Sequence, residues 1–157
     1  MATIHCMCGY IGFGKTTIAK KLEIQYAAKR FTPDEVMMQL YGTDVNVDFM
    51  EKAEHINSYI WKQIRKCLQK NQDVIYDSGS WGIEDRKYVM KMALNLGVDV
   101  VWHQVRCHIE TAKRRTLNRA LDSKELSINE TFFDDNLRKY VPIQEDEHLN
   151  VVYHQGE

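Results

Sequence analysis

The hydrophobic residues of this chain form short runs that alternate with longer stripes of helical spacing. The short runs, typical of buried strands, lie at 2–8, 73–77, 98–105 and 149–153, with a shorter extended piece at Arg30-Phe31. The stripes, typical of amphipathic helices, lie at 15–29, 33–40, 47–70, 89–96 and 110–121. This alternation predicts an α/β fold, with a five-stranded parallel sheet covered by helices on both faces. Ligands are then expected beyond the carboxyl ends of the strands.

Local signals mark several of the expected helix ends. Thr32-Pro33-Asp34-Glu35 has the form of a capping box with proline at the first helical position, and Ser127-Ile128-Asn129-Glu130 has the form of a second box. Gly42 is expected in a turn, and Gly97 is expected to end a helix. The sequence contains no internal repeat, linker or low-complexity segment, so residues 1–157 are predicted to form a single domain.

The composition narrows the class of protein. The formal net charge of −1 offers no basic field for nonspecific nucleic-acid binding, although an enzyme that acts on a nucleic-acid end is compatible with it. The four cysteines form no C-x-x-C pair, and the six histidines show no metal-binding spacing. The sequence has no signal peptide and no apolar run of about 18 residues. We therefore expect a cytoplasmic protein with reduced thiols that does not bind membranes.

The segment from Gly9 to Thr16 fits the pattern G-x-x-x-x-G-K-[ST] of a phosphate-binding loop, and an expected strand and helix flank it. Glycines let main-chain N–H groups turn towards an anion at the start of the helix. Lys15 is expected to reach the β- and γ-phosphates, and the Thr16 hydroxyl to bind Mg²⁺. The motif predicts ATP and Mg²⁺ as cofactors, with nucleotide contacts from Gly9, Gly12, Phe13, Gly14, Lys15, Thr16 and Thr17.

Two aspartates follow predicted strands and are candidates for the chemistry. Asp34 could accept the proton of an attacking hydroxyl, although acids are also common in the first turn of a helix. Asp77 ends a strand that leads into a Gly/Ser turn, where it could orient the Mg²⁺ shell or only satisfy local amides. Both aspartates are also candidates for contacts with an acceptor substrate.

Basic side chains gather on the expected helix at 110–121. Arg115 and Arg119 are four residues apart and share a face, and guanidinium groups suit phosphoryl oxygens or stack on a purine. A solvated basic helix is the commoner outcome of such a run, but nucleotide kinases have a mobile lid after the fourth strand. On the preceding helix, Arg86 could face an acceptor pocket or pair with Glu84 or Asp85 on the surface.

Together these motifs resemble the small AAA-domain predicted kinase family, which is related to chloramphenicol phosphotransferase, zeta toxin, gluconate kinase and the kinase domain of polynucleotide kinase. The resemblance covers nearly the whole chain. It rests on Gly9 to Thr17, Phe31-Thr32-Pro33-Asp34-Glu35, Leu40-Tyr41-Gly42, Val74-Ile75-Tyr76-Asp77 with Arg86, Arg115-x-x-x-Arg119, Phe132-Phe133, Tyr140-Val141-Pro142 and Glu145-Asp146-Glu147. Two positions depart from it. Phe13 stands where relatives often have a small residue, and Asp77 is not followed by the asparagine that some relatives have.

The resemblance implies a three-layer P-loop fold with strand order 2-3-1-4-5 and a helical lid at about 110–130, between the fourth and fifth strands. It implies that Asp34 is the base that activates the acceptor hydroxyl, and that Asp77 lies in the metal shell or the acceptor region. It places Arg115 and Arg119 on the lid, near adenine and the phosphates. The expected catalytic residues are thus Lys15, Asp34 and Arg119.

Three functions follow as hypotheses. The first is an ATP-dependent kinase that phosphorylates a hydroxyl of a small molecule. The second is a polynucleotide 5′-hydroxyl kinase, which needs a basic channel that the net charge does not favour. The third is a nucleotide-binding regulatory ATPase without a small-molecule acceptor. A GTPase is disfavoured, because the sequence has no N-K-x-D segment for guanine.

Overall fold

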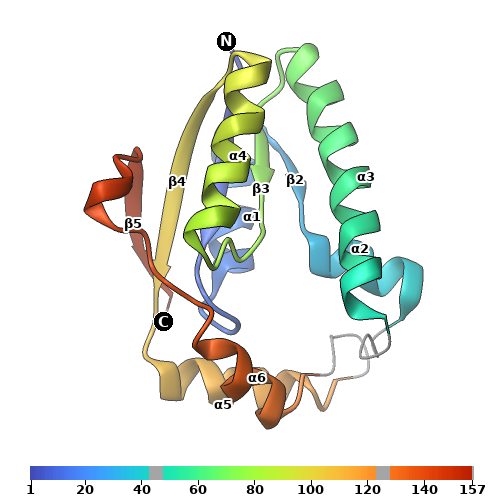
Figure 1. The fold of residues 1–157 in the computed structure, drawn as a ribbon, viewed down its shortest axis with the longest axis vertical. Coiled ribbons are helices and arrows are strands. Elements are labelled where there is room, and N and C mark those ends of the chain that lie inside the picture. Colours follow the sequence, from blue (N-terminus) through green and yellow to red (C-terminus); the bar gives the residue numbers. More distant parts are fainter. Residues whose placement is uncertain (43–47, 123–127, 157) are drawn as a thin grey trace.

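The computed structural model describes residues 1–42, 48–122 and 128–156. Within these ranges, five parallel strands form one central sheet (Figure 1): β1 (Thr3–Cys8), β2 (Lys29–Phe31), β3 (Val74–Tyr76), β4 (Asp99–Arg106) and β5 (Val151–Gln155). Their order across the sheet is β2-β3-β1-β4-β5, which confirms the implied order. The central strand is β1, where Ile4 lies opposite Val74 on β3 and Val100 on β4. The carboxyl ends of the strands therefore meet at one edge of the sheet.

The helices of the described ranges are α1 (Lys15–Tyr26), α2 (Pro33–Tyr41), α3 (Phe49–Gln69), α4 (Ile83–Leu96), α5 (Ile109–Arg119) and α6 (Glu130–Leu137), with a 3₁₀ turn η1 (Glu145–Glu147). Most of them lie close to the predicted stripes. The helix predicted at 15–29 ends earlier, because Ala27 adopts a left-handed φ of 49° and turns the chain into β2. The cap of α6 is Asn129, whose side chain accepts a hydrogen bond from Phe132 N. Ser127 of the predicted capping box lies outside the described residues.

Two hydrophobic cores cover the two faces of the sheet, which makes the fold a three-layer structure (Figure 1). Side chains alternate along β1, so Ile4, Cys6 and Cys8 face one core and Met7 faces the other. The first core is filled by α3 and α4, including the buried stripe of Ile56, Ile60, Ile64 and Leu68. The second core is filled by Ile18, Ala19 and Leu22 of α1, Ala112 of α5 and Phe133 of α6. None of the helices in the described part of the chain is both long and apolar enough to cross a membrane.

Three histidines form a hydrogen-bonded row across β1, β4 and β5 beneath α1. The Nδ1 of His5 is 3.1 Å from the Nε2 of His103, and the Nδ1 of His103 is 2.8 Å from the Nε2 of His154. The ring of His5 stacks on Tyr26 of α1 at 4.3 Å, and its Nε2 lies 3.7 Å from a carboxylate oxygen of Asp73. His5 and His103 are each only 2% exposed. The row therefore places three titratable rings next to one another on the sheet, with His5 packed against α1.

We expect this row to make the folded state sensitive to acid. Burial, followed by the charges of His5 and His154, lowers the pKa of His103 from 6.5 to about 4. The contribution of neutral His103 to the stability of the folded state is complete above pH 6.5. It is lost as pH falls towards 4, because His103 in the unfolded chain binds a proton more tightly than it does in the folded chain. The free energy of unfolding, measured with urea, should be about 2 kcal/mol lower at pH 5 than at pH 7.5. His103→Gln should flatten this dependence, and an unchanged slope in the variant would contradict the assignment.

Candidate active site

The phosphate-binding loop joins the end of β1 to the start of α1. Gly12 and Gly14 have φ values of 78° and 94°, in the left-handed region that favours glycine. A Cβ atom at Gly12 would lie 2.4 Å from the carbonyl oxygen of Ala112 on α5, so the loop packs directly against that helix. The free N–H groups at the start of α1 and the helix dipole favour an anion at this point.

Lys15 is half-buried beside the loop. Its Nζ donates a hydrogen bond to the carbonyl oxygen of Tyr10, at 3.0 Å, and thereby spans the loop. Burial lowers the pKa of Lys15, whereas the carboxylates of Asp77 and Asp34 act in the opposite direction. The ammonium group thus lies within electrostatic reach of both candidate aspartates.

Asp77, directly after β3, contacts the loop through Thr16. The Thr16 hydroxyl donates to Oδ2 of Asp77 at 2.7 Å, and Gly9 N donates to the carbonyl oxygen of Gly79 in the turn that follows. Asp77 is 4% exposed. Its other oxygen, Oδ1, is buried without a hydrogen-bond partner. A buried carboxylate oxygen without a donor is costly, so this atom is suited to accept a hydrogen bond from a ligand or from metal-bound water.

The donor set fits Mg²⁺ held largely by a nucleotide. Among the described residues, no group of three or more His, Cys, Asp or Glu side chains could hold a metal ion on its own. Mg²⁺ commonly takes one or two protein ligands and completes its shell with phosphates and water. The Thr16 hydroxyl oxygen, together with Asp77 and its unpaired Oδ1, meets that requirement.

Asp34 lies in the first turn of α2 and faces the same charges. Surrounding protein raises the pKa of its carboxyl group, although the residue as a whole is exposed to solvent. Lys15 lowers this pKa, Asp77 raises it and Arg119 lowers it. The structure thus brings Lys15, Asp34, Asp77 and Arg119 within electrostatic reach of one another, from four different segments of the chain.

The predicted capping box at the start of α2 is wrong. The Thr32 side chain makes no capping hydrogen bond; its hydroxyl lies 3.1 Å from Oδ2 of Asp77 instead. The Glu35 carboxylate, which would complete the box, accepts from Arg30 at 3.0 Å. Sequence reasoning missed Thr32 and Arg30 as part of the site, because the local pattern T-P-D-E already had a sufficient explanation as a helix start.

Arg86 differs from both placements considered for it, the acceptor pocket and a surface pair with the neighbouring acids of α4. It is 1% exposed, and its Nε and Nη2 donate to both carboxylate oxygens of Glu147, at 2.8 and 2.9 Å. Its Nη1 donates to the carbonyl oxygens of Ser80 and Val141, each at 2.9 Å. Each of its three nitrogens therefore donates to a protein group. Arg86 ties the turn after Asp77 to the 141–147 segment.

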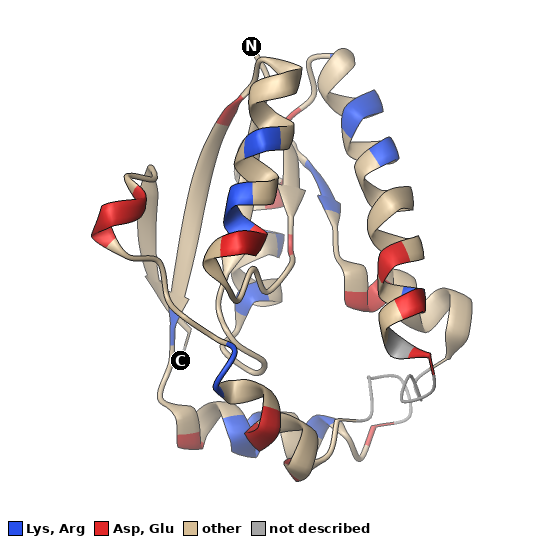
Figure 2. Ribbon diagram, in the orientation of Figure 1, with Lys and Arg blue, Asp and Glu red and all other residues tan. Residues whose placement is uncertain are grey.

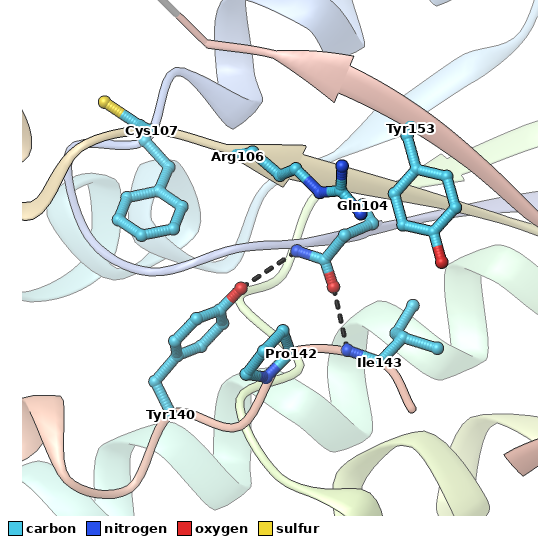
Figure 3. Close-up of a pocket in the computed structure, with 8 residues that line it drawn as sticks. Gln104, Arg106, Cys107, Tyr140, Pro142, Ile143 and Tyr153 are labelled. Carbon is cyan, nitrogen blue, oxygen red and sulfur yellow. Dashed lines mark hydrogen bonds between the residues drawn. The ribbon is translucent and has the colours of Figure 1, made fainter. Parts of the chain in front are cut away.

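The Phe13 side chain packs into the protein beside the loop, and its contact with a nucleotide stays a prediction. It is 4% exposed and packs edge-on against Tyr140 at 5.5 Å, while its N–H donates to the carbonyl oxygen of Tyr10. It borders a pocket of about 310 Å³ at the ends of β4 and β5 (Figure 3). There the buried Gln104 amide bonds to the Tyr140 hydroxyl and to Ile143 N, each at 2.9 Å. The buried Phe13 ring thus anchors the loop to Tyr140.

Tyr10 is a second loop residue with a role that sequence reasoning missed. Its hydroxyl donates to the carbonyl oxygen of Phe133 on α6 at 2.5 Å. Its ring lies 5.0 Å from the ring of Phe133 and 4.9 Å from that of Trp81, in the turn after Asp77. The loop, the turn and α6 are therefore joined by one aromatic cluster, which we define as Tyr10, Phe13, Trp81, Phe133 and Tyr140.

The two arginines expected on the lid occupy different environments on α5. The Nη1 of Arg115 donates to the carbonyl oxygens of Gly12, at 3.3 Å, and of Gly156, so it connects α5 to the loop and to the end of β5. Arg119 is exposed, and its charge acts on both Lys15 and Asp34. Thr17 is exposed in the first turn of α1. Residues 123–127 of the expected lid lie outside the described part of the chain.

Comparison with known proteins supports the same reading of the fold. Residues 4–143 match the family model described as an AAA domain. No curated protein gives a significant match. A candidate kinase from Chloroflexus aurantiacus superposes with a TM-score of 0.78 at 13% identity, covering 98% of this chain and 85% of that one.

Two further solved structures are similar. Kti12 from Chaetomium thermophilum, in complex with ADP-AlF3, has a TM-score of 0.70 at 15% identity, covering 96% of this chain and 88% of its own. A gluconokinase from Sinorhizobium meliloti has a TM-score of 0.65 at 10% identity, covering 99% of this chain and 82% of its own. At these identities the likeness shows the fold alone. With the family match over most of its length and the loop geometry described above, the chain belongs to the AAA domain family, as a small P-loop protein with a kinase-like fold.

Proposed function

We propose that this protein is an ATP- and Mg²⁺-dependent kinase that transfers the γ-phosphoryl group to a hydroxyl of a small molecule. The observation that supports this proposal is the convergence of two sets of groups. The phosphate loop with Lys15 and the Thr16–Asp77 pair form one set, and the carboxylate of Asp34, a residue that is exposed to solvent as a whole, is the other. A protein that only binds nucleotide has no need of a carboxylate base beside the loop lysine.

In this proposal the nucleotide side of the site consists of the loop and α5. The loop amides and Lys15 bind the β- and γ-phosphates, and Arg119 stabilises charge on the γ-phosphoryl group. Arg115 holds the loop against α5 through Gly12 and comes near the nucleotide. Thr16 and Asp77 would hold Mg²⁺, and the chemistry that this ion supplies when bound is neutralisation of phosphate charge.

On the acceptor side, Asp34 is the proposed base. An ionised Asp34 accepts the proton of the attacking hydroxyl, while Lys15 and Arg119 nearby favour its charged form. Most of the rate enhancement would come from positioning and electrostatic stabilisation, because phosphoryl transfer requires little covalent chemistry from the protein.

The distribution of charge favours a small-molecule acceptor over a polynucleotide. Acidic residues gather on α2 and on the end of α3 that adjoins it, whereas basic residues gather on α5 (Figure 2). The acids in the first turns are Asp34 and Glu35 of α2 and Glu51 of α3. A polyanionic strand next to Asp34 would be repelled by this surface. A regulatory ATPase remains the alternative from a different functional class.

A screen with γ-labelled ATP tests the proposal. The acceptor panel should contain sugars, amino sugars, polyols, nucleosides, sugar acids and a short oligonucleotide with a 5′-hydroxyl, each with and without Mg²⁺. We expect labelled product from at least one small molecule, and none with Lys15→Met. Transfer to the oligonucleotide alone would favour the polynucleotide kinase. Nucleotide hydrolysis that responds to a protein partner, without any labelled acceptor, would favour the regulatory ATPase.

A further inference from the structure

The Thr32 hydroxyl lies between two charged groups, the guanidinium of Arg30 and the carboxylate of Asp77. It is 2.6 Å from Nη1 of Arg30 on β2 and 3.1 Å from Oδ2 of Asp77. All three groups are shielded from water, since Thr32 is 7% exposed, Asp77 is 4% exposed and the side chain of Arg30 is 13% exposed. Hydrogen bonds between such groups are stronger than they would be in solvent.

The direction of both hydrogen bonds follows from chemistry. A guanidinium group can only donate, so the Thr32 oxygen accepts from Arg30. The single hydroxyl hydrogen of Thr32 is then left for the Asp77 carboxylate, which in its ionised form can only accept. Thr16 donates to the same oxygen, Oδ2, from the first turn of α1. Two hydroxyl donors therefore share one carboxylate oxygen and leave Oδ1 unpaired.

Three hydrogen bonds fix Asp77, two at its carboxylate and one at its main chain. The two hydroxyl groups hold Oδ2, and Asp77 N donates to the carbonyl oxygen of Phe31 at 2.9 Å. Because Arg30 is charged, its bond to Thr32 polarises the hydroxyl and strengthens the bond to Asp77. Thr32 also immediately precedes α2, so the same hydroxyl connects Asp77 to the turn that bears Asp34.

We propose that Thr32, polarised by Arg30, is a positioning residue that orients Asp77 for binding of the metal–nucleotide complex. This inference rests on the proposed function, because it assumes that Asp77 and Thr16 face Mg²⁺ bound to ATP or ADP. In this role the Thr32 hydroxyl orients a carboxylate of the site, whereas a helix cap would only satisfy main-chain N–H groups of α2. It also explains why α2 begins without a side-chain cap from Thr32.

Arg30 also forms ion pairs outside its bond to Thr32, and these pairs would be its only function if its role were purely structural. Its Nη1 is 3.0 Å from Oε1 of Glu35, and its Nε is 3.6 Å from Oε2 of Glu23. Removing the Glu35 charge breaks one of these ion pairs. It leaves intact the hydrogen bonds from Arg30 to Thr32 and from Thr32 to Asp77, which we call the relay. Glu35→Gln is therefore a matched control for changes within the relay.

The test is calorimetric titration of each variant with ADP in excess Mg²⁺ and again in EDTA. The dissociation constant in EDTA divided by that in Mg²⁺ measures how much Mg²⁺ strengthens ADP binding. Thr32→Val should lower this ratio about tenfold, since a buried carboxylate loses one of its two donors, while the constant in EDTA stays within about twofold. Thr32→Ser keeps the hydroxyl and should restore the ratio, and Glu35→Gln should leave it unchanged.

Arg30→Met gives a second measurement that does not depend on how well Thr32→Val folds. It removes the polarising donor while Thr32 stays in place, and it should lower the ratio about threefold. A wild-type ratio in a folded Thr32→Val variant, or in Arg30→Met, overturns the inference. A wild-type protein whose ADP affinity does not respond to Mg²⁺ would instead count against the proposed function itself, so the two failures are distinguishable.

Discussion

Lys15→Met is expected to lower kcat/KM for phosphoryl transfer by roughly a thousandfold or more. Methionine is close to lysine in length and fits the half-buried position beside the loop, so the change removes the charge with little loss of packing. The lost interaction is strongest with the γ-phosphoryl group in the transition state, where charge develops on its oxygens. The measurement is the initial rate of label transfer to the acceptor found in the screen.

Lys20→Met provides the matched control for this change. Lys20 lies on the same helix, α1, but is exposed to solvent, so its variant should keep the wild-type rate within about twofold. If Lys15→Met retained more than a tenth of the wild-type kcat/KM, the loop lysine would not act on the transferred group, and the kinase proposal would lose its main electrostatic element.

Asp34→Asn is expected to lower kcat by about a thousandfold, within the range for loss of a general base. Asparagine keeps the size of the side chain but cannot accept the hydroxyl proton. The affinity for ATP should stay within about twofold of wild type, because the proposed role of Asp34 is confined to the acceptor. Glu35→Gln, the adjacent acid of the same helical turn, should leave kcat nearly unchanged and serves as the control.

The pH dependence of the same reaction provides an independent check on Asp34. Desolvation by the surrounding protein raises the pKa of this carboxyl group above its usual value of 3.8, Lys15 and Arg119 lower it, and Asp77 raises it further. Because the base must be ionised, kcat/KM should fall as pH decreases through this raised pKa, at a higher pH than for an ordinary aspartate. The acidic limb should disappear from the residual activity of Asp34→Asn. An unchanged limb would assign it to another group.

Much of the fold could be predicted because its signals are local. The phosphate loop is a continuous motif, and the stripe of Ile56, Ile60, Ile64 and Leu68 shows its helical period within a single segment. The strand order came from the family resemblance, and the sheet confirms it. Two local signals misled. Alanine is a strong helix former, but Ala27 takes a left-handed conformation and ends α1, and Thr32 precedes α2 without capping it through its side chain.

The contacts that could not be predicted join residues far apart in sequence. Arg86 and Glu147 are 61 positions apart, and nothing in the helix around Arg86 indicates that its partner lies in η1. Thr32 bonds to Asp77 across 45 positions, and the local capping pattern concealed that bond. Such pairs depend on how β3, the following turn and the 141–147 segment pack together, which periodicity and spacing do not encode.

The aromatic cluster has a consequence for exchanging loops between relatives. The motif allows any residue at the four positions between Gly9 and Gly14, yet two of them, Tyr10 and Phe13, are packed into this cluster. A loop transplanted with small residues at both positions would leave a void beside Phe133 and Tyr140, and large-to-small changes of this kind cost roughly 3–5 kcal/mol each. A functional graft would have to replace the loop together with its partners on α6 and the segment that follows it.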